Sequence, residues 1–345
     1  MGEIKKGDLM HTAKYFTFKG NKKVQCHLCP TACLLEEGET GDCRVRVNKN
    51  GALYTKAYGN PVAAHVDPIE KKPLFHFYPG TTAFSIGTAG CNLHCLNCQN
   101  AEISQCGPDN LRNLDLPPEK VVDATLHYNG HIIAYTYTEP TVFYEYMYDT
   151  SVLAHQKGLK NVMITAGYIN PKPLRDLAPY LDGANIDLKT FDANIYRQIN
   201  KVELKPVLKT LKILRDEDVW LEITNLVIPG WTDNMDTIRR MCEWLVENGF
   251  ANTPLHFSRF HPTYRLPDEP PTPFKTLRQA KQIALDSGIK HVFIGNVPGT
   301  EDEHTFCPQC GKKLINRHGF GASGIKITHG KCDYCGAEIP GVWGD

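Results

Sequence analysis

The sequence has 345 residues, of which 41% are hydrophobic and 22% charged, a balance typical of a globular protein with a substantial core. Lys and Arg together number 38, as do Asp and Glu, so the formal net charge is zero, which argues against a broad electrostatic surface for nucleic acid. There is no run of about 18 apolar residues, and the opening MGEIKKGDLMHTAKYF lacks the apolar stretch of a secretory signal. We therefore expect a cytoplasmic protein without a membrane segment, in which cysteines stay reduced.

The first part of the chain, residues 1–80, is expected to form a cysteine-rich, metal-binding region. Four thiolates suit either zinc or an auxiliary iron–sulfur cluster, and we expect zinc because the segment is short and irregular. His27 is a weaker candidate ligand, since four cysteines suffice. The cysteines have the spacing C-x2-C-x3-C-x9-C and are Cys26, Cys29, Cys33 and Cys43.

Residues 81–300 alternate short β-branched or aromatic runs with longer amphipathic stretches. Near-continuous apolar strands, each followed by a helix, are typical of a parallel sheet covered by helices, and six or seven such units predict an α/β fold, a partial (β/α)6 TIM-like barrel. Such a barrel gathers its chemistry at the C-terminal ends of its strands. The expected strands are 81–88, 131–137, 161–167, 183–189, 220–228, 254–260 and 291–297, and the expected helices include 118–129, 205–218, 234–249 and 272–288.

Three cysteines, Cys91, Cys95 and Cys98, form C-x3-C-x2-C in the loop directly after the first expected strand. A [4Fe–4S] cluster needs one ligand on each iron, so three cysteines leave one iron without a protein thiolate. An open metal position is what catalysis requires, and the odd count therefore favours a catalytic cluster. From spacing alone, the alternatives are a zinc site completed by His94 or a distant ligand, or Cys106 as a fourth cluster ligand.

Two cysteines stand outside the clusters. Cys242 lies in an expected helix, and we predict that it is buried there as a small apolar residue. For Cys106 the choice between a buried residue and one at the mouth of the site stays open.

The tail, residues 301–345, contains two C-x2-C pairs, each followed by glycine. Paired knuckles let four thiolates converge tetrahedrally, so we expect a structural zinc site that supplies much of the tail's folding free energy. Holding the end of the barrel is the expected role, and contact with a partner or an RNA is the alternative. The four cysteines are Cys307, Cys310, Cys332 and Cys335.

The three-cysteine loop after the first strand of an α/β barrel resembles the signature of the radical S-adenosylmethionine (SAM) superfamily. The resemblance implies that SAM chelates the open iron through its amino and carboxylate groups. It further implies that an electron from the cluster cleaves SAM to methionine and a 5′-deoxyadenosyl radical, which abstracts hydrogen from a substrate.

The resemblance also implies which residues line the SAM pocket. YTEP, residues 137–140, takes the place of the Gly-Gly-Glu-Pro of many members and keeps Glu139 but not the glycines, although Glu139 could also simply begin a helix. DLK, residues 187–189, resembles a motif of glycyl-radical activating enzymes whose lysine reaches SAM, with a rim salt bridge as the alternative. LVIPGWTDN, residues 226–234, resembles their Val-Pro-Gly-Trp segment, which flanks the adenine. The expected SAM-pocket residues are Asn100, Tyr137, Thr138, Glu139, Asp187, Lys189, Val227, Ile228 and His261.

Four longer segments extend the likeness to most of the chain. They resemble the radical SAM member of the AmmeMemoRadiSam system, which is named for its co-occurrence with AMMECR and Memo proteins. The resemblance covers about residue 20 to the C-terminus. The segments are CHLCPTACLLEEGETGDCRVR, DPIEKKPLFHFYPGTTAFSIGTAGCNLHCLNCQNAEISQ, PLHFSRFHPTY and IGNVPG.

This likeness implies an oxygen-sensitive radical SAM oxidoreductase that receives electrons from a donor such as a flavodoxin or ferredoxin, with AMMECR and Memo proteins as candidate partners. The substrate is open: a small molecule or an RNA is favoured, and activation of a glycyl-radical enzyme, as by pyruvate formate-lyase activating enzyme, is the alternative. A third hypothesis is a non-enzymatic zinc or iron–sulfur module that binds nucleic acid.

Overall fold

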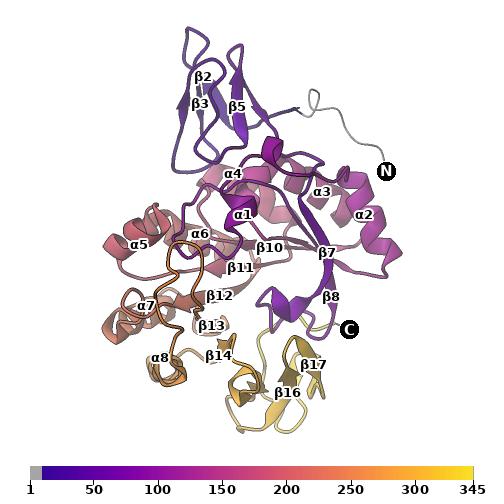
Figure 1. The fold of residues 1–345 in the computed structure, drawn as a ribbon. Coiled ribbons are helices and arrows are strands. Elements are labelled where there is room, and N and C mark those ends of the chain that lie inside the picture. Colours follow the sequence, from indigo (N-terminus) through magenta and orange to yellow (C-terminus); the bar gives the residue numbers. More distant parts are fainter. Residues whose placement is uncertain (1–9, 345) are drawn as a thin grey trace.

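The computed structural model describes residues 10–344, and its centre is an eight-stranded sheet in the order β14-β13-β12-β11-β10-β9-β8-β7 (Figure 1). The edge strand β7 (Ala63–Pro68) runs antiparallel to β8, and every later strand pairs in parallel with the one before it. This is the expected open barrel of parallel strands. The parallel strands are β8 (Thr82–Gly87), β9 (Ile132–Tyr135), β10 (Lys160–Thr165), β11 (Gly183–Asp187), β12 (Trp220–Val227), β13 (Leu255–Arg259) and β14 (Val292–Gly295).

Helices connect successive parallel strands and cover the outside of the sheet (Figure 1). The Asn234 side chain caps α7 by accepting from the Thr237 N–H at 2.9 Å, and α8 ends at Gly288, which has a left-handed φ of 106°. The helices are α1 (Ala101–Ser104), α2 (Pro118–His127), α3 (Tyr144–Gln156), α4 (Pro171–Leu177), α5 (Ala193–Asn200), α6 (Leu204–Asp216), α7 (Met235–Glu247) and α8 (Phe274–Ser287). Short 3-10 turns are η1 (Ile69–Lys71), η2 (Pro108–Asn110), η3 (Pro140–Phe143), η4 (Ala178–Tyr180) and η5 (Glu301–Glu303).

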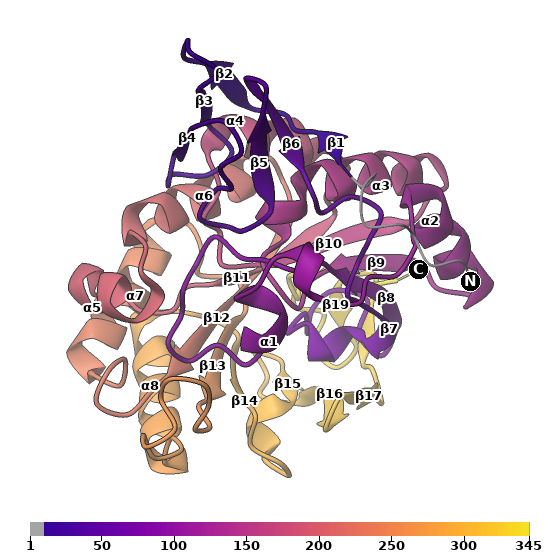
Figure 2. The same ribbon diagram turned by 45° about the horizontal axis from the view of Figure 1, so that its top comes forward.

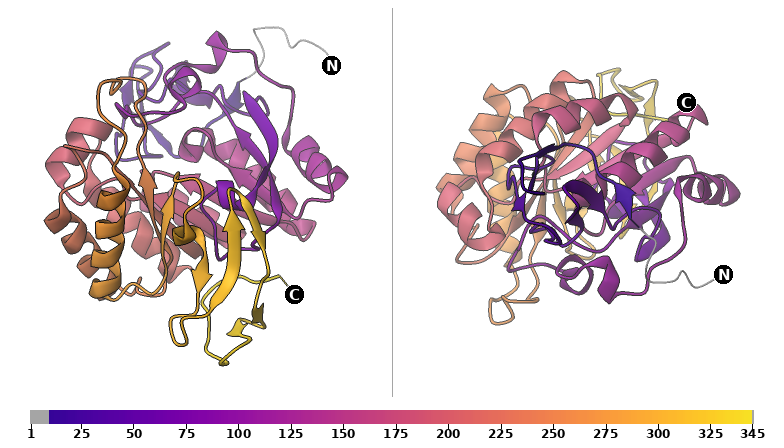
Figure 3. Two further views of the ribbon diagram at one scale, coloured as in Figure 1. Left: turned by 60° about the horizontal axis from the view of Figure 1, so that its bottom comes forward. Right: turned by 90° about the horizontal axis from the view of Figure 1, so that it is seen from above.

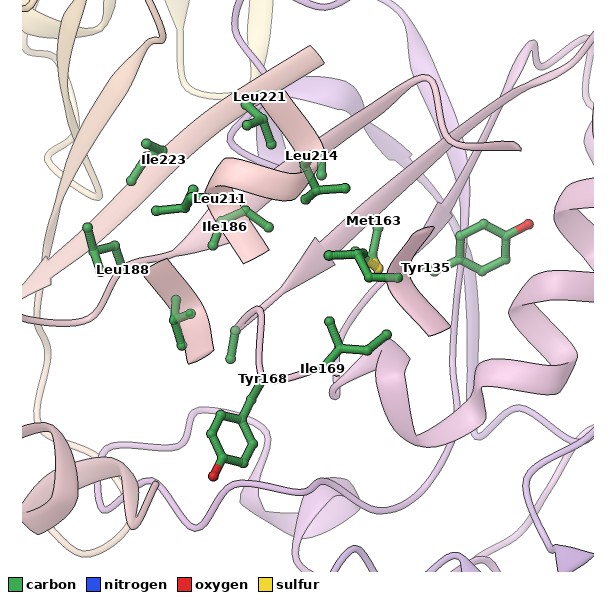
Figure 4. Close-up of a cluster of buried hydrophobic side chains, with 14 of the residues drawn as sticks. Tyr135, Met163, Tyr168, Ile169, Ile186, Leu188, Leu211, Leu214, Leu221 and Ile223 are labelled. Carbon is green, nitrogen blue, oxygen red and sulfur yellow. The ribbon is translucent and has the colours of Figure 1, made fainter. Parts of the chain in front are cut away.

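The main core lies between the sheet and these helices. Figure 4 shows strand residues such as Met163, Ile186 and Ile223 near Leu211 and Leu214 of α6, all of them buried. Each such side chain contributes about 1.5–3 kcal/mol by leaving water. The packing holds the strand ends in fixed positions, which is what a site built on those ends requires.

Residues 10–62 fold into two small antiparallel sheets over the C-terminal ends of the strands (Figures 1 and 2; Figure 3, right). Asn170, at the exit of β10, fixes this N-terminal module through its N–H to the Leu28 carbonyl at 3.0 Å and its side chain to the His27 carbonyl at 2.8 Å. The two sheets are β1-β6-β5 and β2-β3-β4, formed by β1 (His11–Thr12), β2 (Phe16–Phe18), β3 (Val24–Cys26), β4 (Leu34–Leu35), β5 (Arg46–Lys49) and β6 (Ala52–Thr55).

The C-terminal tail lies at the opposite end of the barrel from the N-terminal module (Figure 1; Figure 3, left). Arg317 is buried and donates to the Phe75 carbonyl at 2.6 Å, and the Val342 N–H donates to the His76 carbonyl at 2.7 Å. These bonds fasten the tail to the segment that leads into β8. Its strands are β15 (Thr305–Phe306), β16 (Lys313–His318), β17 (Gly321–Ser323), β18 (Ile327–Thr328) and β19 (Lys331–Cys332).

The boundary expected at residue 80 differs from the structure, because β7 lies before it and yet pairs with β8 along its full length. The barrel sheet therefore starts at Ala63, and of the described residues before it, 10–62 form the separate module. None of the helices within residues 10–344 combines the length and apolar character needed to cross a membrane.

Candidate active site

Cys91, Cys95 and Cys98 line a cavity of about 580 Å³ at the C-terminal ends of the parallel strands. Their loop follows β8 directly. A Cβ added at Gly87, the last residue of that strand, would lie 2.5 Å from the Thr136 carbonyl oxygen, so β8 and the exit of β9 are in direct backbone contact. The volume falls within the roughly 300–1,000 Å³ of ligand-binding pockets.

Hydrogen bonds position all three sulfur atoms. The Asn200 side chain donates to Cys95 Sγ at 3.2 Å, the Leu93 N–H donates to Cys91 Sγ at 3.3 Å, and Ser104 Oγ lies 3.2 Å from Cys98 Sγ. Burial, followed by the Glu139 carboxylate and the neighbouring thiols, raises the pKa of Cys91 well above its usual value. A cationic partner is therefore needed before this thiol can act as a thiolate ligand, and an iron–sulfur cluster fits that requirement.

The exit of β9 forms the next part of the wall. Tyr137 has a left-handed φ of 67°, and its carbonyl accepts a hydrogen bond from the Asn100 side chain at 2.5 Å. Thr138 Oγ1 donates to the Thr88 carbonyl at 2.8 Å. These bonds tie the cysteine loop to this exit, and Asn100, Tyr137 and Thr138 all line the cavity.

Glu139 is only 2% exposed, and four donors surround its carboxylate. Oε1 accepts from the Thr141 N–H at 3.1 Å, from Thr141 Oγ1 at 2.6 Å and from Thr165 Oγ1 at 2.5 Å. Oε2 accepts from the Ala166 N–H at 2.8 Å. Glu139 thus joins the exits of β9 and β10, and its N-cap bond to Thr141 agrees with the alternative that it begins a helical turn.

Asp187 ends β11, Lys189 follows two residues later, and both line the cavity as an ion pair, with Nζ 2.8 Å from Oδ2. Burial lowers the pKa of Lys189, but Asp187 and Cys95 outweigh it, so the pKa is raised overall and the ammonium stays charged. Lys189 is therefore a fixed cation near the cysteine loop. The rim salt bridge considered from the sequence is present.

Three expected pocket residues lie outside this cavity. Val227 and Ile228 are buried in packing clusters, whereas the neighbouring Leu226 does line the cavity. His261 is exposed and absent from the lining.

The alternative ligands of the cysteine loop have other partners. His94 Nε2 lies 2.8 Å from Asp42 Oδ2, and its Nδ1 lies 3.1 Å from Arg44, so both ring nitrogens face the N-terminal module. Cys106 Sγ points back to the Glu102 carbonyl at 3.0 Å and does not line the cavity. Cys242 is fully buried on α7, as predicted.

Sequence reasoning missed the inward-facing side chains of the strands. Asn185, Thr224 and His256 line the cavity from β11, β12 and β13. His256 Nε2 lies 2.6 Å from the fully buried carboxylate of Glu222, which also accepts the His76 N–H at 2.7 Å. Inward alternation along barrel strands was the available signal.

Residues from distant parts of the chain close the far side of the cavity. Lys72 and Phe75 come from the segment before β8, and Glu303 and Phe320 come from the tail. Lys72 is buried and paired with Asp67 at 2.7 Å. The tail therefore contributes to the wall of the cavity as well as to the end of the barrel.

The two outer cysteine groups differ in geometry. In the tail, the four Sγ atoms of Cys307, Cys310, Cys332 and Cys335 all lie within 4.8 Å of one another, an arrangement that could bind a metal. In the N-terminal module, four cysteines line a smaller cavity together with Arg46 and Asn92. These four are Cys26, Cys29, Cys33 and Cys43.

Comparison with known proteins gives the same picture of the barrel. Residues 85–245 match the profile of the Radical SAM superfamily. The chain is 46% identical over 332 residues to an uncharacterized protein of Methanocaldococcus jannaschii, a match that covers 96% of this chain and 99% of that protein. It is 23% identical over 218 residues to the pyruvate formate-lyase 1-activating enzyme of Escherichia coli, covering 59% of this chain and 89% of that enzyme.

Among solved structures, the chain is similar to Streptococcus suis SuiB bound to S-adenosylmethionine, with a TM-score of 0.50. The identity is 13%, and the match covers 70% of this chain and 56% of that chain. This similarity concerns the fold alone.

Proposed function

Since the chain belongs to the radical SAM superfamily, whose members use a [4Fe–4S] cluster and SAM, we propose that it is an enzyme that binds the cluster at Cys91, Cys95 and Cys98 and SAM beside it. When bound, the cluster supplies one electron that cleaves SAM to methionine and a 5′-deoxyadenosyl radical, which abstracts hydrogen from the substrate. The observation that carries the proposal is that these three cysteines share one cavity with Glu139 and Lys189.

The chain's own residues would hold the ligand. Lys189 would offer a charged donor to the carboxylate of SAM, and its pairing with Asp187 keeps it in position. The Asn100–Tyr137 bond holds the cysteine loop against the exit of β9, where the amino group of SAM would meet backbone and Thr138 oxygens.

The test is anaerobic incubation of the iron-loaded protein with dithionite and SAM. We expect 5′-deoxyadenosine and methionine in equal amounts, and Cys95→Ala should abolish both because it removes one cluster ligand. Cys106→Ser is the matched control, since Cys106 does not line the cavity, and it should keep the activity. Undiminished product from Cys95→Ala would overturn the assignment.

For the substrate we propose a small polar molecule, or a nucleoside of an RNA, that occupies the part of the cavity away from the cysteines. Polar side chains of Asn185, Thr224, His256 and Asn296 line that part and would orient such a ligand. The AmmeMemoRadiSam likeness of the sequence adds AMMECR and Memo proteins as proposed partners. Metabolite and nucleoside profiles of a deletion strain are the test, and unchanged profiles under anaerobic growth would count against both substrates.

Activation of a glycyl-radical enzyme is a second candidate, favoured by the similarity to the Escherichia coli activating enzyme. Incubation with SAM, dithionite and a glycyl-radical enzyme of the same organism would then give a doublet radical signal on that enzyme. A normal yield of 5′-deoxyadenosine without this signal would leave only the first candidate.

We also propose that the tail cysteines bind zinc and that a flavodoxin or ferredoxin donates the electron. The short distances between the tail sulfurs, 3.6 Å for Cys307–Cys335 and 3.9 Å for Cys310–Cys332, support zinc because four thiolates at a Zn–S distance of about 2.3 Å are spaced about 3.8 Å apart. The test is metal analysis of a Cys310→Ser variant, which should contain one zinc ion fewer than the wild type.

A further inference from the structure

We propose that Cys26, Cys29, Cys33 and Cys43 bind an iron–sulfur cluster, in place of the zinc ion that their sequence context favours. This cluster would be a second metal centre, beside the one in the proposed function, and only its position against the active-site loop rests on that function. Spacing of the sulfurs, unused donors around them and their position against the active-site loop carry the proposal.

The spacing of the sulfurs is the first observation. In the C-terminal tail, the four cysteine Sγ atoms all lie within 4.8 Å of one another, close enough to share one metal ion. The four N-terminal cysteines, which also lie within residues 10–344, do not meet this criterion, so their sulfur atoms are spread more widely. They line a common cavity of about 20 Å³, which has room for about one water molecule. Four thiolates on one zinc ion lie about 3.8 Å apart, so the wider spacing of these sulfurs fits a group with several metal and sulfide atoms better than a single ion.

Arg46 supplies the second observation. It lines the same cavity at 2% exposure, and its Nη2 donates to the Lys14 carbonyl at 2.9 Å and to Glu145. Its Nε and Nη1 are buried and have no partner among the described residues. Unpaired buried donors cost about 1–3 kcal/mol each, so a bound acceptor is expected, and the sulfides of a cluster provide acceptors beyond the four thiolates.

The third observation is the contact between this site and the cysteine loop of the active site. A Cβ added at Gly90, which precedes Cys91, would lie 2.6 Å from the Cys43 carbonyl oxygen, so the two backbones touch. His94 lies in the same loop and is held by Asp42 and Arg44, the two neighbours of Cys43 in sequence. A structural zinc site has no need to lie against a catalytic cluster, whereas a second redox centre does.

The experiment uses the full chain with the triple change Cys91→Ala, Cys95→Ala and Cys98→Ala, which removes the active-site cluster. After anaerobic reconstitution with iron and sulfide, we expect about two to four iron atoms per chain with equal sulfide, and one zinc from the tail. Adding Cys29→Ser and Cys33→Ser should remove this iron, and adding Cys106→Ser instead should leave it. A triple variant with two zinc ions and no iron, or with the N-terminal site empty, would overturn the proposal.

Metal content of the wild-type chain provides a second measurement should the triple variant not fold. More than about four iron atoms per chain, with one zinc, supports the proposal, and about four iron atoms with two zinc ions overturns it. The readouts are independent of SAM cleavage, so loss of the proposed function leaves them unchanged.

Discussion

Gly90 offers the sharpest test of how the N-terminal module and the active-site loop fit together. It is buried with a φ of 93°, and an added Cβ would lie 2.4 Å from Val45 Cγ2 and 2.6 Å from the Cys43 carbonyl oxygen. Alanine at this φ costs about 1–2 kcal/mol, and forcing a methyl group into the packed contact costs about 1–3 kcal/mol more. Gly90→Ala should therefore lower the free energy of unfolding by about 2–5 kcal/mol.

Gly158→Ala is the matched control, because Gly158 has a similar φ of 72° but no atom within 4 Å of an added Cβ. It should lose only the conformational part, about 1–2 kcal/mol. Urea unfolding followed by circular dichroism under anaerobic conditions measures the free energy of unfolding of both variants. The iron content of the purified variants is a second measurement, and it should fall only in Gly90→Ala. Equal losses of stability and normal iron content in the two variants would show that the modules do not meet as described.

Three further outcomes follow from the cavity. Glu139→Gln should weaken SAM binding by about 1–3 kcal/mol in anaerobic titration calorimetry, because an amide cannot accept from all four donors. Glu102 is exposed, so Glu102→Gln should bind SAM as the wild type does. Equal affinities of the two variants would contradict a role of Glu139 in shaping the SAM site. Burial, opposed by Arg317, raises the pKa of Glu303 from 4.5 to about 7, so ionisation of this carboxyl opposes folding. The free energy of unfolding of the wild type should therefore fall relative to that of Glu303→Gln as the pH rises from about 4.5 to 7. Urea midpoints of the two proteins that change in parallel with pH would refute this. Phe320→Ala should raise the substrate KM about tenfold, equivalent to roughly 1.4 kcal/mol, and should leave SAM cleavage in the absence of substrate unchanged. Tyr334 is an exposed aromatic residue outside the cavity, so Tyr334→Ala should change neither the KM nor SAM cleavage.

The barrel could be predicted from the sequence because strands buried on both faces appear as continuous apolar runs. The run NVMITAG at 161–167 became β10 (Lys160–Thr165), and GANIDLK at 183–189 became β11 (Gly183–Asp187). The strands of the N-terminal module were not predicted, since elements of two to four residues such as β1 and β4 are too short to show a period.

The site was only partly accessible to the same reasoning. Cysteine spacing identified the loop, because ligands close in sequence must be close in space. Val227 and Ile228 lie in packing clusters, and no local pattern separates an apolar residue of a core from one of a pocket. His256 and Phe320 could be assigned to the cavity only from the tertiary structure. His256 lies on a strand and faces inward, and Phe320 belongs to the tail, which starts over 200 residues after the cysteine loop.

The attachment of the tail has a consequence for assembly. The hydrophobic cluster of the tail is small, comprising five buried residues, two of which are cysteines, so the metal proposed for its four cysteines would provide much of its order. The same tail carries Phe320 and Glu303 to the cavity and fastens through Arg317 to the segment before β8. A chain without the proposed tail metal would therefore leave this part of the cavity wall unformed. Under the proposed function, the tail metal would thus control how well the cavity shields a radical from the surroundings.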